Sequence, residues 1–295
     1  MTRRGSASGP LVRTSRSTTI GRLKGRARIS VWIGAVIVGL VLLMAVTSLV
    51  WTPFDPLLAN PAIRLQPPST AHWLGTDRLG RDVLSQIMAG ARVALLVGST
   101  VVLIGALIGV PLGLLAALRG GPIGAMLGRG FDLLMAIPGL LLAIIFAAAF
   151  GASTATAAVA LGIAGIPAFA RLTRAGAINV LNSEYVTAAK ASGAGSRHIA
   201  ITHIFPNIIG TLIVHASVAF GVAVLAEAGL SYLGLGTPPP TPSWGRMLQD
   251  SQSFLGTHLN LVLAPGIAIG LAVLGFNLLG DGLRDALDPK LRYRR

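Results

Sequence analysis

The chain has 295 residues, of which 53% are hydrophobic and 12% charged, and its mean hydropathy is +0.73. Soluble domains carry about 25% charged residues, so this composition excludes an ordinary soluble domain and places most of the chain in lipid. The absence of cysteine excludes disulfides, thiolate metal sites and a cysteine nucleophile. The net charge of +14 suggests nucleic acid as a partner, but the position of the charge argues against one.

The chain opens with a basic tail that an apolar run follows. Eight Lys or Arg residues and no acid lie before residue 30. The run Val31–Val50 is long enough for a helix to cross a bilayer, and no small-residue cleavage site follows it. We predict residues 1–30 as a cytoplasmic tail and 31–50 as a retained first transmembrane helix. The alternative for the tail is solvated charge without a specific partner.

Five further apolar segments have the length of a membrane span. They lie near residues 92–118, 131–150, 152–170, 207–231 and 259–280. Only helices satisfy their own backbone in such segments, so we predict an all-α membrane protein with six transmembrane helices.

Basic residues predict the orientation of these helices. With the N-terminus inside, 19 of the 24 Lys and Arg residues lie on the cytoplasmic side. Both termini are therefore expected in the cytoplasm. Residues 51–91 form an extracytoplasmic segment, 92–280 a five-helix core, and 281–295 a cytoplasmic tail.

A mixed-charge cluster lies in the outer segment before the second span. It consists of Asp77, Arg78, Arg81 and Asp82. Asp77 could cap the helix that leads into the membrane, or the cluster could form a docking surface, and the sequence leaves both open.

Small residues predict close helix packing. The second span carries glycines at four-residue spacing, and the last span repeats the pattern; they are Gly105, Gly109 and Gly113, then Gly266 and Gly270. The sequence does not decide whether these glycines pack against a helix of the same subunit or against a neighbouring subunit. In the fourth span, Gly162, Gly165 and Pro167 predict an interrupted helix.

A polar, basic island separates the fourth and fifth spans over residues 182–206. It predicts two short helices. Asn182 or Ser183 would cap the first, and Gly193 or Gly195 would end it. Ser196 would cap the second, which should stop near Pro206.

The stretch Glu184–Asn207, EYVTAAKASGAGSRHIAITHIFPN, resembles the cytoplasmic "EAA" coupling loop of ABC-importer permeases. The family pattern is roughly E-A-A-x3-G-x9-I-x-L-P. Ala188, Ala189, Gly193 and Pro206 match it, whereas Thr187, His203 and Phe205 depart from it.

The resemblance extends over about residues 65–291. It includes HWLGTDRLGRDVLSQIMAGAR at 72–92, FDLLMAIPGLLL at 131–142, EAGLSYLGLG at 227–236, PPTPSWG at 239–245 and FNLLGDGLRDALDPKL at 276–291. These motifs are similar to those of the C-type permease of dipeptide, oligopeptide or nickel ABC importers. The resemblance therefore implies a type I importer permease bundle in the bacterial cytoplasmic membrane.

The resemblance also implies partners. Two ABC ATPase domains would dock on the coupling loop, with contacts at Glu184, Thr187, Ala188, Ala189, Lys190, Gly193, Arg197, His203, Phe205 and Pro206. A sister permease would form the other half of the pathway. A binding protein would dock outside, near Asp77, Arg78, Arg81, Asp82, Trp244 and Arg246.

The expected function is alternating-access import of short peptides, with nickel or another small solute as the alternative within the same class. No phosphate loop of the G-x4-G-K-[ST] type occurs in the sequence, so ATP and Mg²⁺ would be used by the partner ATPases. We expect no bound cofactor, no metal site and no nucleic-acid partner.

Glu227 is the acid placed furthest inside a span, where ionisable groups are costly and usually functional. It could line the pathway, relay protons or hydrogen-bond to a neighbour near the interface. The proton role supports a rival function, a proton-coupled carrier. We find no set of residues for catalysis.

Overall fold

The computed structural model describes residues 16–287, with side chains for residues 29–284. Residues 1–15 and 288–295, which belong to the two predicted tails, lie outside the described residues. Within the described range the chain is helical apart from loops and one isolated β-bridge between Thr76 and Asp82. The helices are α1 (Arg16–Val50), η1 (Pro61–Ile63), α2 (Val83–Arg119), α3 (Gly121–Met135), α4 (Gly139–Phe150), α5 (Thr154–Leu181), α6 (Glu184–Ala191), α7 (Ser196–His198), the π-helix η2 (Ile199–Ile204), α8 (Phe205–Tyr232), α9 (Trp244–Ser251), η3 (Gln252–Phe254) and α10 (Leu259–Leu287).

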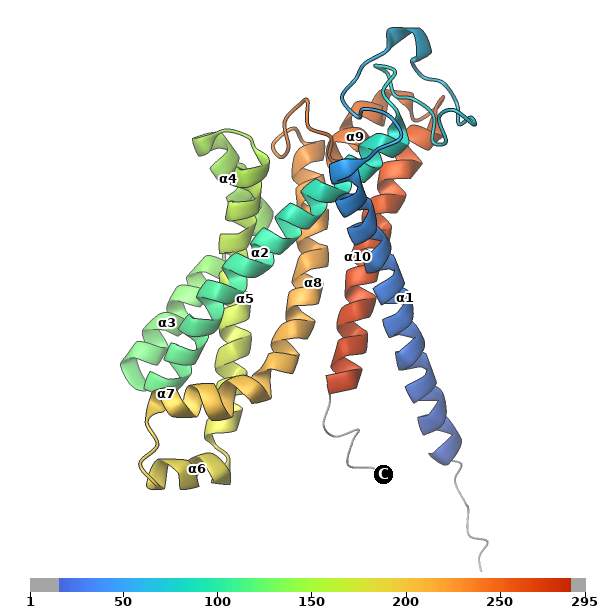
Figure 1. The fold of residues 1–295 in the computed structure, drawn as a ribbon. Helices are drawn as coiled ribbons and strands as arrows, with labels where there is room; N and C mark the ends of the chain where they lie inside the picture. The colour runs from blue at the N-terminus through green and yellow to red at the C-terminus, as the bar shows by residue number, and fades with distance from the viewer. Residues whose placement is uncertain (1–15, 288–295) are drawn as a thin grey trace, which may run out of the picture.

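The long helices run between two ends of an elongated bundle (Figure 1). Residues 51–82 and α9 form one end, here called the platform end, and α6 lies at the opposite end. The start of α1 and the end of α10 also lie at the α6 end.

Five helices are long and apolar enough to cross a membrane, and α3 with α4 makes a sixth candidate span if the bent pair crosses as one. The five are Ile29–Val50, Val83–Arg119, Thr154–Leu181, the continuous stretch Ser196–Tyr232, and Leu259–Arg284. The prediction of an all-α membrane protein with six spans is confirmed.

The third span differs from the single helix predicted over residues 131–150. The chain forms two helices, α3 and α4, whose axes are bent by 76°. Pro138 has an extended backbone and is the N-cap of α4. A proline disfavours the helical conformation in the residue before it, so α3 ends before this point. Most of residues 119–130, expected as a connection, belongs to α3.

The predicted interruption of the fourth span is wrong. α5 continues as one helix through Gly162, Gly165 and Pro167. Gly162 is a site of close contact instead, because a Cβ there would lie 2.7 Å from Ile104 Cδ1 of α2. Packing against a neighbouring helix offsets the intrinsic cost of glycine and proline in a helix.

The glycines of α2 face α5 within this chain. A Cβ on Gly109 would lie 2.6 Å from the Ile166 carbonyl oxygen, and one on Gly105 would lie 2.7 Å from the Phe169 ring. The packing interpretation therefore holds for α2. At Gly266 and Gly270 of α10, by contrast, a Cβ would meet no described atom within 4 Å.

Replacing Gly109 with valine should destabilise the bundle, because the new side chain must displace the α5 backbone. Overpacking typically costs about 1–3 kcal/mol. Gly266→Val is the matched control, since its Cβ would lie in open space. We expect the purified Gly109 variant to unfold at a clearly lower temperature than the wild type and the control. Equal unfolding temperatures for the two variants would contradict the assignment of this contact.

Candidate functional site

The coupling segment, residues 182–207, begins with α6. Ser183 is its N-cap in an extended conformation. The helix ends at Ala191 with Ser192 as its C-cap, and the next residue, Gly193, has a φ of +88°, whereas Gly195 has a negative φ. The Ala194 N–H donates to Ala189 O and the Gly193 N–H donates to Lys190 O, both at 3.0 Å. This is the Schellman arrangement, in which glycine is the favoured residue.

The second half of the coupling segment does not stop at Pro206 as predicted. α7, the π-helix η2 and α8 follow one another without a break, so the helix is continuous from Ser196 to Tyr232. Pro206 is the second residue of α8 and follows the π-helix η2, where the Phe205 N–H donates to the Ala200 carbonyl oxygen. The wider π-helical turn lets the continuous helix accommodate a residue that has no N–H to donate. The coupling segment is therefore a direct extension of α8.

Apolar side chains fix the coupling segment to the bundle. Val186, Ile199 and Ile204 are buried in one cluster with residues of α5 and α8, including Phe169 and Ile208. Such a cluster holds α6 to the ends of both long helices, because separating them would expose apolar surface.

The residues predicted to contact an ATPase lie on the outward side of this segment. Ala189 and His203 are half-buried, and the others are exposed: Glu184, Thr187, Ala188, Lys190, Gly193, Arg197, Phe205 and Pro206. A Cβ on Gly193 would meet no described atom within 4 Å. The segment therefore presents small residues on a surface that the described side chains leave uncovered.

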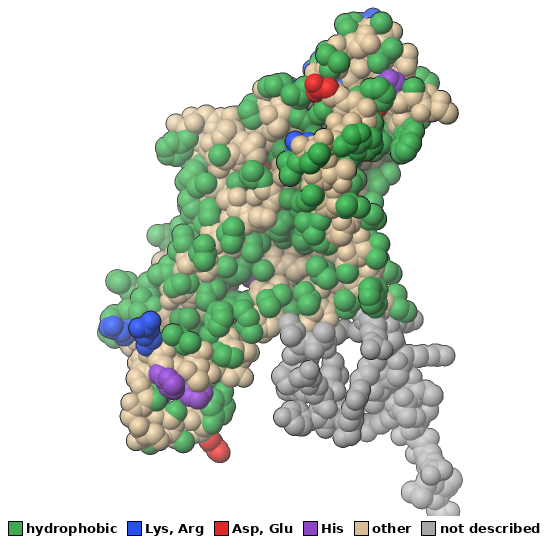
Figure 2. Space-filling model, viewed as in Figure 1, with side chains coloured by type: hydrophobic (Ala, Val, Ile, Leu, Met, Phe, Trp, Pro, Cys, Tyr) green, Lys and Arg blue, Asp and Glu red, His purple; other side chains and the backbone are tan. Residues whose placement is uncertain are grey.

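Aromatic and histidine rings gather on the same segment. His203 lies 5.8 Å from Tyr185 and 5.9 Å from His198, measured between ring centroids. Asn207 donates to the His203 carbonyl oxygen at 2.6 Å. Figure 2 shows histidine side chains together at this end of the molecule. Sequence reasoning singled out His203 and missed Tyr185, whose only sequence signal is its place in the first turn of α6. Within residues 29–284, no group of three potential metal ligands occurs.

At the platform end, Asp82 and not Asp77 caps α2. The Asp82 carboxylate accepts from the Ser85 backbone N–H at 2.8 Å and from the Ser85 hydroxyl at 2.7 Å. Its other oxygen lies 2.9 Å from His72 Nδ1. Asp77 instead closes the turn before α2, where it accepts from the Leu79 and Arg81 N–H groups.

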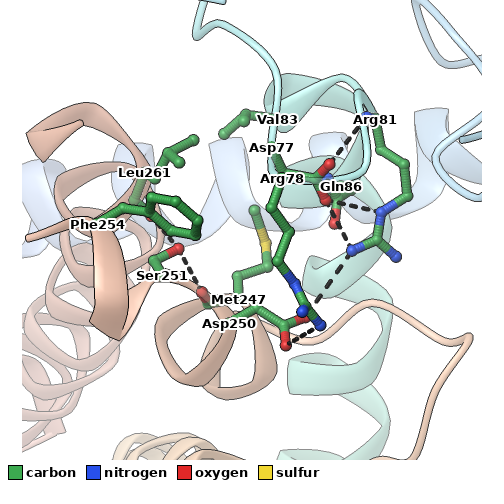
Figure 3. A pocket seen from close by; sticks show the side chains of 10 residues that line it. All are labelled: Asp77, Arg78, Arg81, Val83, Gln86, Met247, Asp250, Ser251, Phe254 and Leu261. Atoms are coloured by element: carbon green, nitrogen blue, oxygen red, sulfur yellow. Dashed lines mark hydrogen bonds and ion pairs between the residues drawn. The ribbon is translucent and has the colours of Figure 1, made fainter. Parts of the chain in front are cut away.

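Charged residues from distant parts of the chain meet beside this cap (Figure 3). Arg81 lies 2.7 Å from Asp77. Asp250 of α9 lies 3.1 Å from Arg78, 3.8 Å from Arg81 and 3.7 Å from Arg246. Asp250 joins the outer segment to α9, and sequence reasoning missed it although it lies four residues after Arg246.

The predicted docking residues differ in exposure. The Arg78 side chain is 47% exposed, whereas Trp244 is only 2% exposed and donates from Nε1 to the Ile87 carbonyl oxygen at 2.9 Å. Asp82 is also buried. Trp244 and Asp82 hold the platform together internally. The Arg81 side chain is 12% exposed and the Arg246 side chain 25%, so Arg78 is the most accessible of the three arginines.

Glu227 is 2% exposed and lies in the last two turns of α8. Its Oε1 accepts from the Ser231 hydroxyl at 2.6 Å and from the Thr237 hydroxyl at 3.0 Å. Of the three roles left open by the sequence, this geometry favours a hydrogen-bonded carboxylate inside the subunit over one that lines a pathway.

Residues 109–293 match a protein family whose description is "binding-protein-dependent transport system inner membrane component". The dipeptide transport system permease protein DppC of Escherichia coli is 46% identical over 267 residues, covering 88% of this chain and 89% of that protein. DppC of Alkalihalophilus pseudofirmus is 43% identical over 88% of this chain and 86% of its own length. The glutathione transport system permease protein GsiD of Pectobacterium atrosepticum is 42% identical, covering 88% of this chain and 87% of that protein.

Among solved structures, the fold is similar to an inward-facing form of the MetNI methionine ABC transporter. The TM-score is 0.58 at 17% identity, covering 69% of this chain and 96% of that one. This similarity concerns the fold alone.

Removing the α2 cap with Asp82→Ala should loosen residues 51–82. The variant loses a helix cap and leaves the buried Ser85 hydroxyl and His72 without their partner, at a cost of about 2 kcal/mol or more. Asp55→Ala is the control, because that carboxylate bonds to one exposed backbone N–H. We expect limited proteolysis to cleave the Asp82 variant faster within this segment. Cleavage at the control's rate would contradict the assigned role of the cap.

Proposed function

The chain belongs to the family of binding-protein-dependent transport system inner membrane components, and we propose that it is the permease subunit of an ATP-driven importer of short peptides. The 46% identity to a protein named for dipeptide transport carries this proposal. Another relative is named for glutathione, itself a tripeptide. These names favour peptides over the nickel alternative.

The protein is a multi-pass protein of the bacterial inner membrane, as its family and its apolar helices indicate. In our proposal the α6 end lies in the cytoplasm. This orientation places 19 of the 24 Lys and Arg residues on the cytoplasmic side, where basic residues are enriched in membrane proteins. The described ends of α1 and α10 lie at the same end of the bundle, so both termini would be cytoplasmic.

We assign α6 as the docking element for one of two ABC ATPase domains. Ala188 and Gly193 offer a small-residue surface that a groove in the ATPase could approach closely, and Glu184, Lys190 and Arg197 are exposed around it. ATP and Mg²⁺ would be bound by the ATPases, so the role of this chain is mechanical. A displacement of α6 passes to α5 and α8 through Val186, Ile199 and Ile204.

We assign the platform end as the contact for the extracytoplasmic binding protein. Arg78, Arg81, Arg246 and Asp250 line a hollow walled by the loop Pro239–Pro242. Three arginines beside two carboxylates, Asp77 and Asp250, leave positive charge to attract an acidic partner surface. A sister permease would supply the other half of the pathway, and ATPase closure would switch the pathway between its two open sides.

Gentle extraction of the tagged chain, followed by mass spectrometry, tests the assembly. We expect a sister permease, ATPase subunits and a binding protein in the same complex. The complex should hydrolyse ATP faster with a dipeptide-loaded binding protein. Stimulation by nickel instead would identify nickel as the substrate. Recovery of the chain alone, active with a proton gradient and no ATP, would favour the proton-coupled carrier.

Replacing Gly193 with asparagine or aspartate should uncouple the transporter. Asparagine tolerates a positive φ, so Gly193→Asn keeps the end of α6 but places a side chain on the docking surface. Gly193→Asp adds a charge there as well. We expect peptide uptake by either variant to fall at least tenfold, whereas the amount of inserted protein stays near the wild-type level.

Gly121→Asn is the matched control for this substitution. Gly121 of α3 also has a positive φ, +47°, and a Cβ there would also meet no described atom within 4 Å. Its variant should retain uptake. Wild-type uptake and ATPase binding in both Gly193 variants would show that α6 is not the docking element.

A further inference from the structure

Four hydroxyl groups surround or extend the Glu227 carboxylate. Thr237 donates to Glu227, and the Thr237 backbone N–H donates to the Ser231 hydroxyl at 2.8 Å. The Ser243 side chain also lies near the carboxylate. The Thr154 hydroxyl lies 2.9 Å from the Thr237 hydroxyl. Since Thr237 gives its only hydroxyl proton to Glu227, Thr154 must be the donor in that last bond.

These residues come from four different parts of the chain. Thr154 is the first residue of α5, and Glu227 and Ser231 lie in the last two turns of α8. Thr237 belongs to the loop 233–243, and Ser243 is the N-cap of α9. The network therefore joins the platform ends of α5 and α8 to the loop and to α9. The opposite ends of the same two helices carry the coupling segment.

Close packing around the network limits local movement. Ala157 and Leu161 of α5 are buried in one cluster with Ala223 and Leu230 of α8. A Cβ on Gly245 of α9 would lie 2.6 Å from the Ala228 Cα of α8. A displacement of α9 or of the loop therefore cannot be absorbed there and must move the ends of α5 and α8.

We propose that Glu227 is a positioning residue for coupling, which transmits movement of α9 and the loop 233–243 to α5 and α8, and through them to the coupling segment. The inference rests on the proposed function, because it takes the platform as the docking surface for the binding protein. Glu227 would then act at a distance from the transported peptide. The position requires a side chain with an acceptor oxygen, because one oxygen accepts from two hydroxyls at once.

Thr154→Val tests the inference with the smallest change. It removes the hydroxyl that ties α5 to the network and keeps nearly the same shape. Thr100→Val is the control, because the Thr100 hydroxyl donates only to Leu96 of its own helix. Both variants would be studied in the complete importer, reconstituted in lipid vesicles. ATP hydrolysis would be measured with and without the peptide-loaded binding protein.

We expect Thr154→Val to lower the stimulation by the binding protein at least fivefold, with basal hydrolysis within twofold of the wild type. Thr100→Val should match the wild type. Glu227→Leu should lose stimulation, and Glu227→Gln should retain most of it, because its amide oxygen still accepts from both hydroxyls. Adding Thr154→Val to Glu227→Leu should cause no further loss, since both break one network.

Wild-type stimulation in assembled Thr154→Val and Glu227→Leu complexes would overturn the inference. An equal fall of basal and stimulated hydrolysis would overturn it too, because that result marks a role in stability alone. If Glu227→Leu fails to assemble, Thr154→Val decides. A wild-type complex that the binding protein does not stimulate would refute the proposed function itself.

Discussion

The close approach of α2 and α5 determines where the other helices can lie. At Gly109 and Gly113 the backbone of α2 meets the backbone of α5 directly, and at Gly105 it meets the Phe169 ring. The same device continues into α3, where a Cβ on Gly124 would lie 2.6 Å from the Ala116 carbonyl oxygen of α2. In lipid, where apolar side chains gain little from leaving the solvent, such contacts are a main source of helix association. α5 therefore stands at a fixed distance from α2, and its far end gives α6 a fixed place.

Two helices of the bundle connect both functional ends. α5 and α8 each pass from the platform end to the coupling segment, and no loop interrupts either of them. A helix in lipid keeps its backbone hydrogen bonds because no water can replace them. Bending is therefore costly, and each helix responds to a force at one end as a nearly rigid rod. The π-helix η2 keeps the path continuous past Pro206.

The sequence was sufficient to predict features that depend on composition or on local conformation. Span lengths follow from hydropathy, and Gly193 ends α6 because its conformation favours glycine. Features that depend on distant neighbours were missed. Gly162 and Pro167 suggested a break because the contacts from α2 that support α5 were unknown. Trp244 was predicted as a docking residue for a binding protein, yet its indole donates to Ile87, which is 157 residues away. Asp250 was missed for the same reason, since its partner Arg78 lies 172 residues away.

The bent pair α3–α4 determines whether the chain crosses the membrane an even or an odd number of times. α4 has 12 residues, which at about 1.5 Å per residue reach roughly 18 Å, too short for about 30 Å of hydrocarbon. Five crossings would leave the start of α1 and the end of α10 on opposite faces of the bilayer, but both lie at the α6 end. The pair together therefore makes the sixth crossing. As a consequence, a flexible aqueous linker could join the end of α10 to the first helix of a second permease. Such a tandem fusion would require no extra membrane crossing.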